Sequence, residues 1–283
     1  MERRGKLEAL GGWIAMAAFT VFSAMVADTA LAATSITASK HNLGSGGPGP
    51  VNTTSTTEVC VFCHTPHGGD TAKSAPLWNR GAGAATYFVY DGLWGDRPSS
   101  FDGGQDSDGK ALTVGSISAL CLSCHDGATA LDLLINKPGS GANTATTYTF
   151  TDTIGSLNGM TNIGGDLKND HPIGVAYCGG KKPSSTGNAT DVATNCKDAD
   201  FNNASSSGGL FWVDTTGGTA AREKTDMILY VRNFGTTTGN WPAVECGSCH
   251  DPHNADSFEA NKSVAFLRIK NDNSQLCLTC HKK

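Results

Sequence analysis

The chain has 283 residues and a formal net charge of −5, and only 17% of its residues are charged. No stripe of basic residues runs along it, which argues against a nucleic-acid partner. Glycine occurs 35 times and aromatic residues make up 7% of the chain, while long helical periodicity is absent. We expect a chain of this composition to have difficulty in burying a protein-only core.

The first 32 residues have the pattern of a signal peptide. A basic start at residues 3–6 precedes an apolar run at residues 13–26, and Ala-Leu-Ala at residues 30–32 has the form of a cleavage site. The run is shorter than the roughly 20 residues that a membrane span needs, which disfavours a retained anchor. We therefore expect export to the cell surface or the extracellular space, with the periplasm as the alternative.

The next part, residues 33–165, contains three histidine-bearing segments. A lone His41 comes first, followed by Cys-x-x-Cys-His-x-Pro-His at residues 60–67 and Leu-Cys-Leu-Ser-Cys-His at residues 120–125. Cys-x-x-Cys-His is the attachment signal of a c-type haem. Two thioethers hold the edge of the porphyrin, and the adjoining histidine is placed to bind the iron. We expect this part to form a dihaem module.

The last part, residues 166–283, repeats the same order and is expected to form a second dihaem module. His171 is its lone histidine, and the two motifs recur at residues 246–253 and 276–281. A long insertion at about residues 175–240 separates the lone histidine from the motifs. Because the motif order is kept while the loop lengths vary, we infer that the fold maintains the haem positions.

The four motifs predict four covalently bound haem c groups. The cysteines expected to form the thioethers are Cys60, Cys63, Cys121, Cys124, Cys246, Cys249, Cys277 and Cys280. The histidines expected to be proximal iron ligands are His64, His125, His250 and His281. Zinc sites also use Cys-x-x-Cys pairs, but zinc does not explain a histidine directly after all four of them. A thioredoxin-like redox role explains it no better.

Four further histidines match the four distal positions. They are His41, His67, His171 and His253. We therefore expect bis-histidine coordination at every haem. Residues three apart on a helical turn face the same side, so His67 and His253 are each expected to reach a neighbouring iron. Met160 and Met227 are alternative axial ligands, which we expect to be packing residues instead.

Two cysteines, Cys178 and Cys196, lie outside the motifs. In an exported protein we expect them to form a disulfide, with two unrelated free thiols as the alternative. In the chain-entropy model such a crosslink contributes roughly 3 kcal/mol.

The predicted fold is a multihaem cytochrome c, mostly coil, with short helices at the Cys-x-x-Cys-His motifs, a few short strands and a core built around four haems. The strands are expected at residues 210–213, 227–231 and 264–269.

The combined pattern resembles the extracellular tetrahaem cytochromes of the OmcE-like kind, whose subunits polymerise into conducting filaments. The resemblance covers the ligand segments, at residues 40–44, 60–68, 120–127, 170–174, 246–253 and 276–281. It implies a continuous haem chain with stacked haem pairs, and a distal histidine supplied by a neighbouring subunit. His41, close to the expected mature N-terminus, is the candidate for that contact, with ligation inside its own subunit as the alternative.

The function we expect is non-catalytic electron conduction by a head-to-tail homopolymer. Its partners would be other redox proteins or extracellular electron acceptors, and we expect no membrane span in the mature chain. A soluble periplasmic electron shuttle is the second interpretation. A multihaem reductase is the third, and it needs an open iron position, which eight histidines for eight axial positions do not leave.

Overall fold

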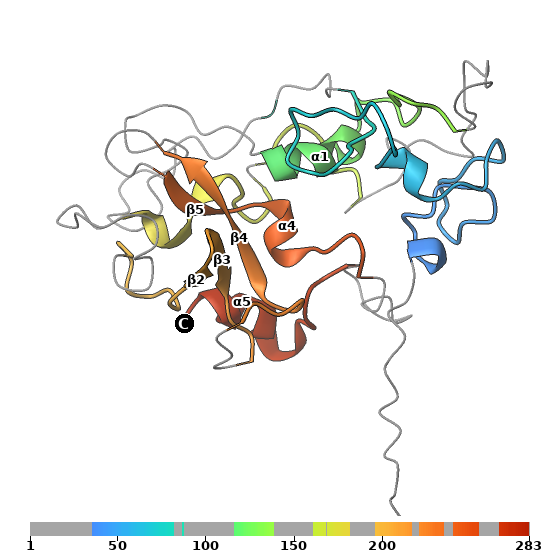
Figure 1. The fold of residues 1–283 in the computed structure, drawn as a ribbon. Coiled ribbons are helices and arrows are strands. Elements are labelled where there is room, and N and C mark those ends of the chain that lie inside the picture. Colours follow the sequence, from blue (N-terminus) through green and yellow to red (C-terminus); the bar gives the residue numbers. More distant parts are fainter. Residues whose placement is uncertain are drawn as a thin grey trace, which may run out of the picture. The chain divides into compact units, whose positions relative to one another are not determined.

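A computed structural model of the chain describes residues 36–81, 87, 116–138, 161–167, 169–181, 196–216, 221–234, 240–254 and 266–282 (Figure 1). All of them belong to the unit that runs from Ala33 to Lys283. The predicted signal peptide and Met160 lie outside the described residues. In the part of the chain that is described, no helix is long and apolar enough to cross a membrane.

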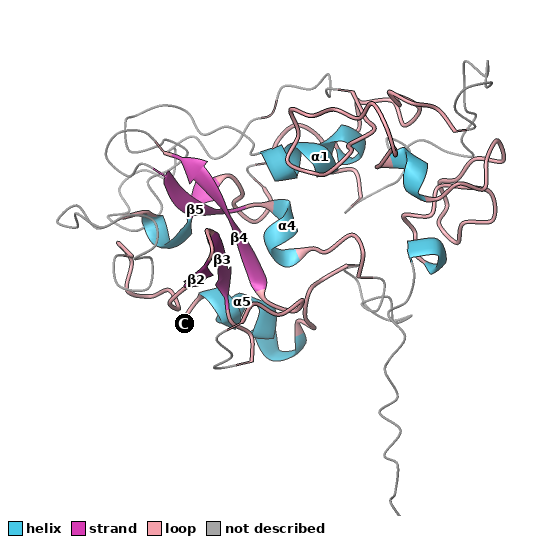
Figure 2. Cartoon of the chain, in the orientation of Figure 1, coloured by secondary structure: helices cyan, strands magenta, loops and turns pink. Residues whose placement is uncertain are grey.

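Loops and turns dominate, and the helices between them are short (Figure 2). The helices are η1 Ile36–Ala38, η2 Cys60–Phe62, α1 Ser116–His125, η4 Tyr177–Gly179, α4 Cys246–Cys249, η7 Asp272–Ser274 and α5 Gln275–Cys280. Each of the four motifs starts on one of these helices, as predicted. Helices α4 and α5 end where His250 and His281 turn into extended backbone, with φ of −107° and −102°.

One antiparallel sheet has the strand order β1-β5-β4-β3-β2. Its strands are β1 Val175–Ala176, β2 Ser205–Ser207, β3 Leu210–Val213, β4 Met227–Asn233 and β5 Asn240–Val244. The predictions of β3 and β4 are confirmed, and β4 continues two residues beyond its expected end. Strand β5 was not predicted, because Pro242 breaks the sequence pattern of a strand at its centre. Since β1 pairs only with Ala243 and Val244, Pro242 faces an open edge on that side, where proline is tolerated.

The strand predicted at residues 264–269 is wrong over the part that the structure describes, residues 266–269. There the backbone makes only an isolated bridge, between Leu267 and His250. Phe266 has a φ of 63°, in the left-handed region, and this conformation breaks an extended run. Residues 264 and 265 lie outside the described residues.

The sheet carries the largest apolar cluster of the described chain. Trp241, Tyr177, Phe211 and Met227 are almost completely buried in it, together with Leu229. The Trp241 indole also donates a hydrogen bond of 2.9 Å from Nε1 to the Tyr177 carbonyl, so its polar atom is satisfied. Met227 is thus a core residue of this cluster.

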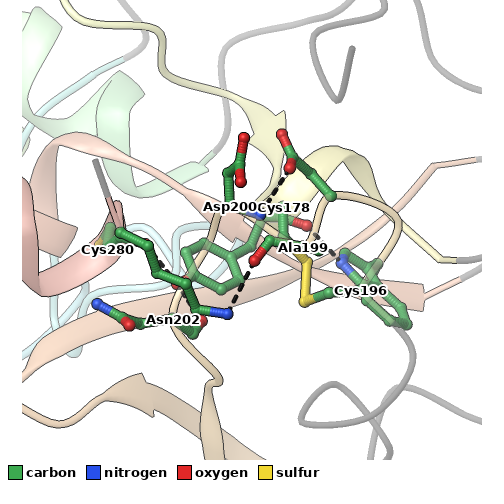
Figure 3. Close-up of a disulfide and its surroundings, with 10 residues drawn as sticks. Cys178, Cys196, Ala199, Asp200, Asn202 and Cys280 are labelled. Carbon is green, nitrogen blue, oxygen red and sulfur yellow. Dashed lines mark hydrogen bonds between the residues drawn. A yellow bond between two sulfur atoms is a disulfide. The ribbon is translucent and has the colours of Figure 1, made fainter.

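The predicted disulfide between Cys178 and Cys196 is formed (Figure 3). It joins η4 to the start of the segment that leads into β2. The Asp198 N–H donates to the Cys178 carbonyl at 3.0 Å, which holds this segment beside the crosslink. Figure 3 shows the same segment continuing past Asn202 beside Cys280 of the fourth motif.

The described residues before the sheet, from 36 to 167, bury much smaller apolar clusters. Val61, Phe62 and Leu134 form one, and Leu122 with Leu167 forms another. Polar side chains bridge the chain here. The amide of Asn79, for example, donates to two backbone carbonyls, both at 2.7 Å.

Candidate haem-attachment sites

The first motif is held by a short segment that crosses its histidine in the antiparallel direction. Trp78 pairs with His64, and the Asn79 N–H donates to the Cys63 carbonyl at 2.9 Å. The Leu77 carbonyl accepts the N–H of the residue after His64, also at 2.9 Å. We call residues 77–79 the first crossing segment. The Trp78 ring meets the His64 imidazole edge-on, with centroids 5.9 Å apart.

The third motif has a crossing segment with the same hydrogen bonds, at residues 266–268. Leu267 pairs with His250, and the Arg268 N–H donates to the Cys249 carbonyl at 2.9 Å. The Phe266 carbonyl accepts the N–H of Asp251 at 2.8 Å. Phe266, with a φ of 63°, is left-handed like its counterpart Leu77, with a φ of 53°. The first and third motifs therefore resemble each other in the backbone of their crossing segments as well as in their own sequences.

The fourth motif is crossed in the same way by residues 200–202, which follow the disulfide. Phe201 pairs with His281 and its ring packs on the imidazole, with centroids 4.5 Å apart. The Asn202 N–H donates to the Cys280 carbonyl at 2.8 Å, and the Asp200 carbonyl accepts the Lys282 N–H at 2.8 Å. The insertion thus places a crosslinked segment against the last histidine of the chain.

The second motif is held differently. Cys121, Cys124 and His125 form the last turns of helix α1, and the His125 carbonyl accepts the Ile163 N–H at 2.9 Å. The His125 ring is fixed from the same loop, by a hydrogen bond of 2.7 Å between Nδ1 and the Thr161 carbonyl.

The imidazole orientations suit metal ligands. A histidine that binds a metal usually donates its other ring N–H to a carbonyl or carboxylate, which fixes the ring. Nδ1 of His64 lies 2.8 Å from the Pro76 carbonyl, and Nδ1 of His171 lies 3.0 Å from the Pro172 carbonyl. Because Nδ1 of His64, His125 and His171 is hydrogen-bonded, Nε2 is the nitrogen of each ring that remains to bind the iron.

The eight motif cysteines are free thiols, and the disulfide uses only the other two. Burial raises the pKa of Cys63 and Cys280 to about 12 and that of Cys249 to about 11. These raised pKa values differ from the lowered cysteine pKa that a reactive dithiol needs, so Cys63, Cys249 and Cys280 do not have the environment of a redox nucleophile. Thiols left unpaired beside an oriented histidine are the donor set that c-type haem requires. Among the described residues no cluster of three or more His, Cys, Asp or Glu side chains is arranged to hold a metal ion.

Neighbouring attachment sites follow the order of the chain. Arg80, next to the first crossing segment, donates to the Ser123 carbonyl within the second motif at 2.9 Å. Helices α1 and α4 are in contact, and the Cys121 and Cys246 side chains shift each other's pKa, upward for Cys121 and downward for Cys246. Cys249 of the third motif and Cys280 of the fourth pack against the same apolar cluster. The first motif therefore adjoins the second, the second the third, and the third the fourth.

A buried carboxylate joins the second motif to the third. Glu245 precedes α4 and caps it, and its carboxylate accepts a short hydrogen bond from the Ser118 hydroxyl of α1. The same hydroxyl accepts the Cys246 N–H at 3.0 Å, and Arg232 lies 3.3 Å from Glu245. Burial raises the pKa of Glu245, although Ser118 and Arg232 act to lower it. Helices α1 and α4 are thereby tied together at their first turns.

Gly247 lets the third motif sit close to the sheet. A Cβ added at Gly247 would lie 2.5 Å from the Tyr230 hydroxyl of β4 and 2.9 Å from the Ile117 side chain. Only glycine fits between α4 and these neighbours without displacing them.

The four predicted distal histidines are placed differently from one another. The His41 ring lies 6.2 Å from that of His125, and the His253 ring lies 6.1 Å from that of His64, measured between centroids. His171 is near enough to His281 for their charges to interact. His67 is exposed.

The helical turn assumed for the Cys-x-x-Cys-His-x-Pro-His extension is wrong. Helices η2 and α4 end before the histidine of each motif, and the Pro-His pairs follow in bends and turns. Proline at 66 and 252 therefore does not start a helix. His253 nevertheless approaches His64 of another motif, in line with the expected reach to a neighbouring site.

The crossing segments are the site residues that sequence reasoning missed. Two lie downstream of their motif at unequal distances and one lies far upstream. Two of them carry asparagine at the same position, Asn79 and Asn202, but the third has Arg268 there. Trp78, Leu267 and Phe201 share only a large apolar side chain. The one local signal is the apolar residue itself in a polar loop, which is too common to identify a partner.

A family model described as the doubled CXXCH motif matches residues 242–283, which hold the third and fourth motifs. No curated protein matches the chain. The match supports covalent c-type haem and electron transfer at this pair of motifs, and a multihaem c-type cytochrome as the broad class of protein.

Proposed function

We propose that the protein is a tetrahaem c-type cytochrome that conducts electrons along a closely spaced chain of bis-histidine haems. The haems are numbered by their motifs in chain order, so Cys60 and Cys63 hold the first. When bound, each supplies an iron that gains and loses one electron at a time. The chain's own residues would hold the haems, orient the axial imidazoles and keep the sites close together.

The observation that carries this proposal is the contact order of the four attachment sites. Arg80, next to the first crossing segment, donates to the Ser123 carbonyl within the second motif. The Ser118 hydroxyl of α1 accepts the Cys246 N–H, and Cys249 and Cys280 pack against one apolar cluster, so consecutive motifs are neighbours. A porphyrin tethered at each site would lie beside the next. That arrangement serves electron transfer between haems, whereas isolated sites would not.

Haem content and reversible reduction test the tetrahaem conduit. Mass spectrometry of the purified holoprotein should show four covalent haems, and a redox titration should reduce all four. Fewer than four haems would contradict the proposal.

Catalysis is not part of the proposed function. Eight histidines serve eight axial positions, so no iron is left open for a substrate. The reduced protein should therefore bind carbon monoxide slowly and incompletely. Rapid binding at one haem would instead favour the alternative of a multihaem reductase.

We propose further that the protein is exported and acts as a subunit of an extracellular filament. The resemblance of its ligand segments to filament-forming tetrahaem cytochromes supports this, and so does the formed disulfide, since such bonds persist in oxidising compartments. Its partners would be further copies of the chain and redox proteins or extracellular acceptors. The alternative is a soluble periplasmic shuttle. Electron microscopy of native material separates the two, because only single particles at high concentration would support the shuttle.

A further inference from the structure

We propose that His253 is the distal ligand of the first haem, opposite His64. In the same way His41 is the distal ligand of the second haem, opposite His125. Both assignments lie within one chain. They rest on the proposed function, since they assign ligands to haems proposed there.

The ring separations carry this inference. Two imidazoles bound to one metal from opposite sides have metal–nitrogen bonds of ~2.0 Å, which puts their ring centroids roughly 6.2 Å apart. The separations are 6.1 Å for His64 and His253 and 6.2 Å for His41 and His125. Rings stacked face to face are closer, at 4.2 Å for His41 on Phe266. Each histidine pair is therefore spaced for a metal between the rings.

The polar contacts of the first pair also suit a shared metal. Nδ1 of His64 is engaged by the Pro76 carbonyl at 2.8 Å, and Nδ1 of His253 lies 3.7 Å from the Asp251 carboxylate. The backbone N–H of His253 donates to the same carboxylate at 3.0 Å. Carbonyl and carboxylate partners on the outer nitrogen are the usual support of a metal-binding imidazole. The two ring planes are 19° apart.

The second pair has equivalent supports from different segments. The Thr161 carbonyl lies 2.7 Å from Nδ1 of His125. Phe266 stacks on His41 with an interplanar angle of only 10°, which fixes the plane of that imidazole. The planes of His41 and His125 are 59° apart.

The assignments give His41 a role inside its own chain. Its ring stacks on Phe266 of the second module and lies 6.2 Å from the His125 ring of the first. A copy of the chain therefore completes its second haem without a neighbour, and a filament contact has to use other residues.

The test combines histidine variants with loss of single haems. His253→Ala should convert one low-spin haem to high-spin, and so should His41→Ala, as counted by absorption and electron paramagnetic resonance spectra. In C60A/C63A protein, which lacks the first haem, His253→Ala should produce no high-spin haem, whereas His41→Ala should still produce one. Removing the second haem by C121A/C124A should give the reverse. His171→Ala is the matched control and should produce one high-spin haem in both backgrounds.

Persistence of the His253→Ala signal without the first haem would overturn that assignment, as would persistence of the His41→Ala signal without the second. Haem content is measured on the same samples, so failure of the tetrahaem proposal is recognised separately.

The unmodified holoprotein supplies a second test that does not depend on variants folding. Ligation within one chain predicts that the first and second haems stay low-spin on dilution to single particles. The two plane angles predict different anisotropy in the resonance signals of the first and second haems. A high-spin haem that appears on dilution and disappears in filaments, and that His41→Ala reproduces, would overturn the assignment of His41.

Discussion

Strands β3, β4 and β5 bury a continuous apolar cluster around Trp241, and a disulfide closes the loop beside it. Residues 36–81 and 116–138, here called the N-terminal region, bury only small clusters such as Val61, Phe62 and Leu134. Side-chain hydrogen bonds to backbone carbonyls connect that region instead. The sheet region therefore resembles an ordinary protein core, whereas the N-terminal region has the form expected where a large apolar cofactor completes the packing.

The sharpest way to test this contrast is to withhold the first two haems. In C60A/C63A/C121A/C124A protein, amide protection from hydrogen exchange should be lost across residues 36–81, because too little apolar surface remains buried there. Strand β4 should stay protected in the same molecules and serves as the internal control. Equal protection of both regions would show that the N-terminal region folds without cofactor.

The sheet region should respond most to loss of its core aromatic. Trp241→Ala removes a fully buried indole and its hydrogen bond to Tyr177, and should lower the free energy of unfolding by about 3–5 kcal/mol. Denaturant unfolding of the holoprotein measures the change. Val231→Ala, at an exposed position of the same sheet, is the control and should change stability by less than about 0.5 kcal/mol.

The N-terminal region should be most sensitive to a polar change. Arg80 is fully buried and donates to the carbonyls of Ser123, Ala130 and Leu131 at 2.8–2.9 Å. Arg80→Met leaves these carbonyls without donors and should lower the free energy of unfolding by about 2–3 kcal/mol. Arg222→Met, at an exposed arginine, should have little effect. A stability unchanged by Arg80→Met would mean that the carbonyls find other donors.

The smallest expected effect concerns backbone strain in the first crossing segment. Leu77 is exposed and has a φ of 53°, a conformation that asparagine adopts more readily than leucine. Leu77→Asn should raise the free energy of unfolding by about 1 kcal/mol. Leu133→Asn, at a comparably exposed leucine outside the positive-φ positions, should give no such gain. Equal effects of the two variants would exclude strain as the cause.

Sequence patterns predicted the parts of the molecule whose chemistry is local. The helices at the motifs and strands β3 and β4 follow from short-range residue types, and the Cys178–Cys196 disulfide follows from the two cysteines that lie outside the motifs. The crossing segments do not, because a carbonyl of Leu77 or Asp200 is a backbone group that any residue could supply. Nor does the approach of His253 to His64, since it depends on how distant loops fold back and not on their spacing.

The proposed pairing of His253 with His64 would have a consequence for how the protein is made. If the chain is exported from its N-terminus, as proposed, it presents its first motif long before residue 253 arrives. Early in maturation the first haem would then have one open iron face, although its thioethers would already be formed. Closing that face would be among the last events of maturation, so truncation near the C-terminus should leave a defect at the opposite end of the sequence.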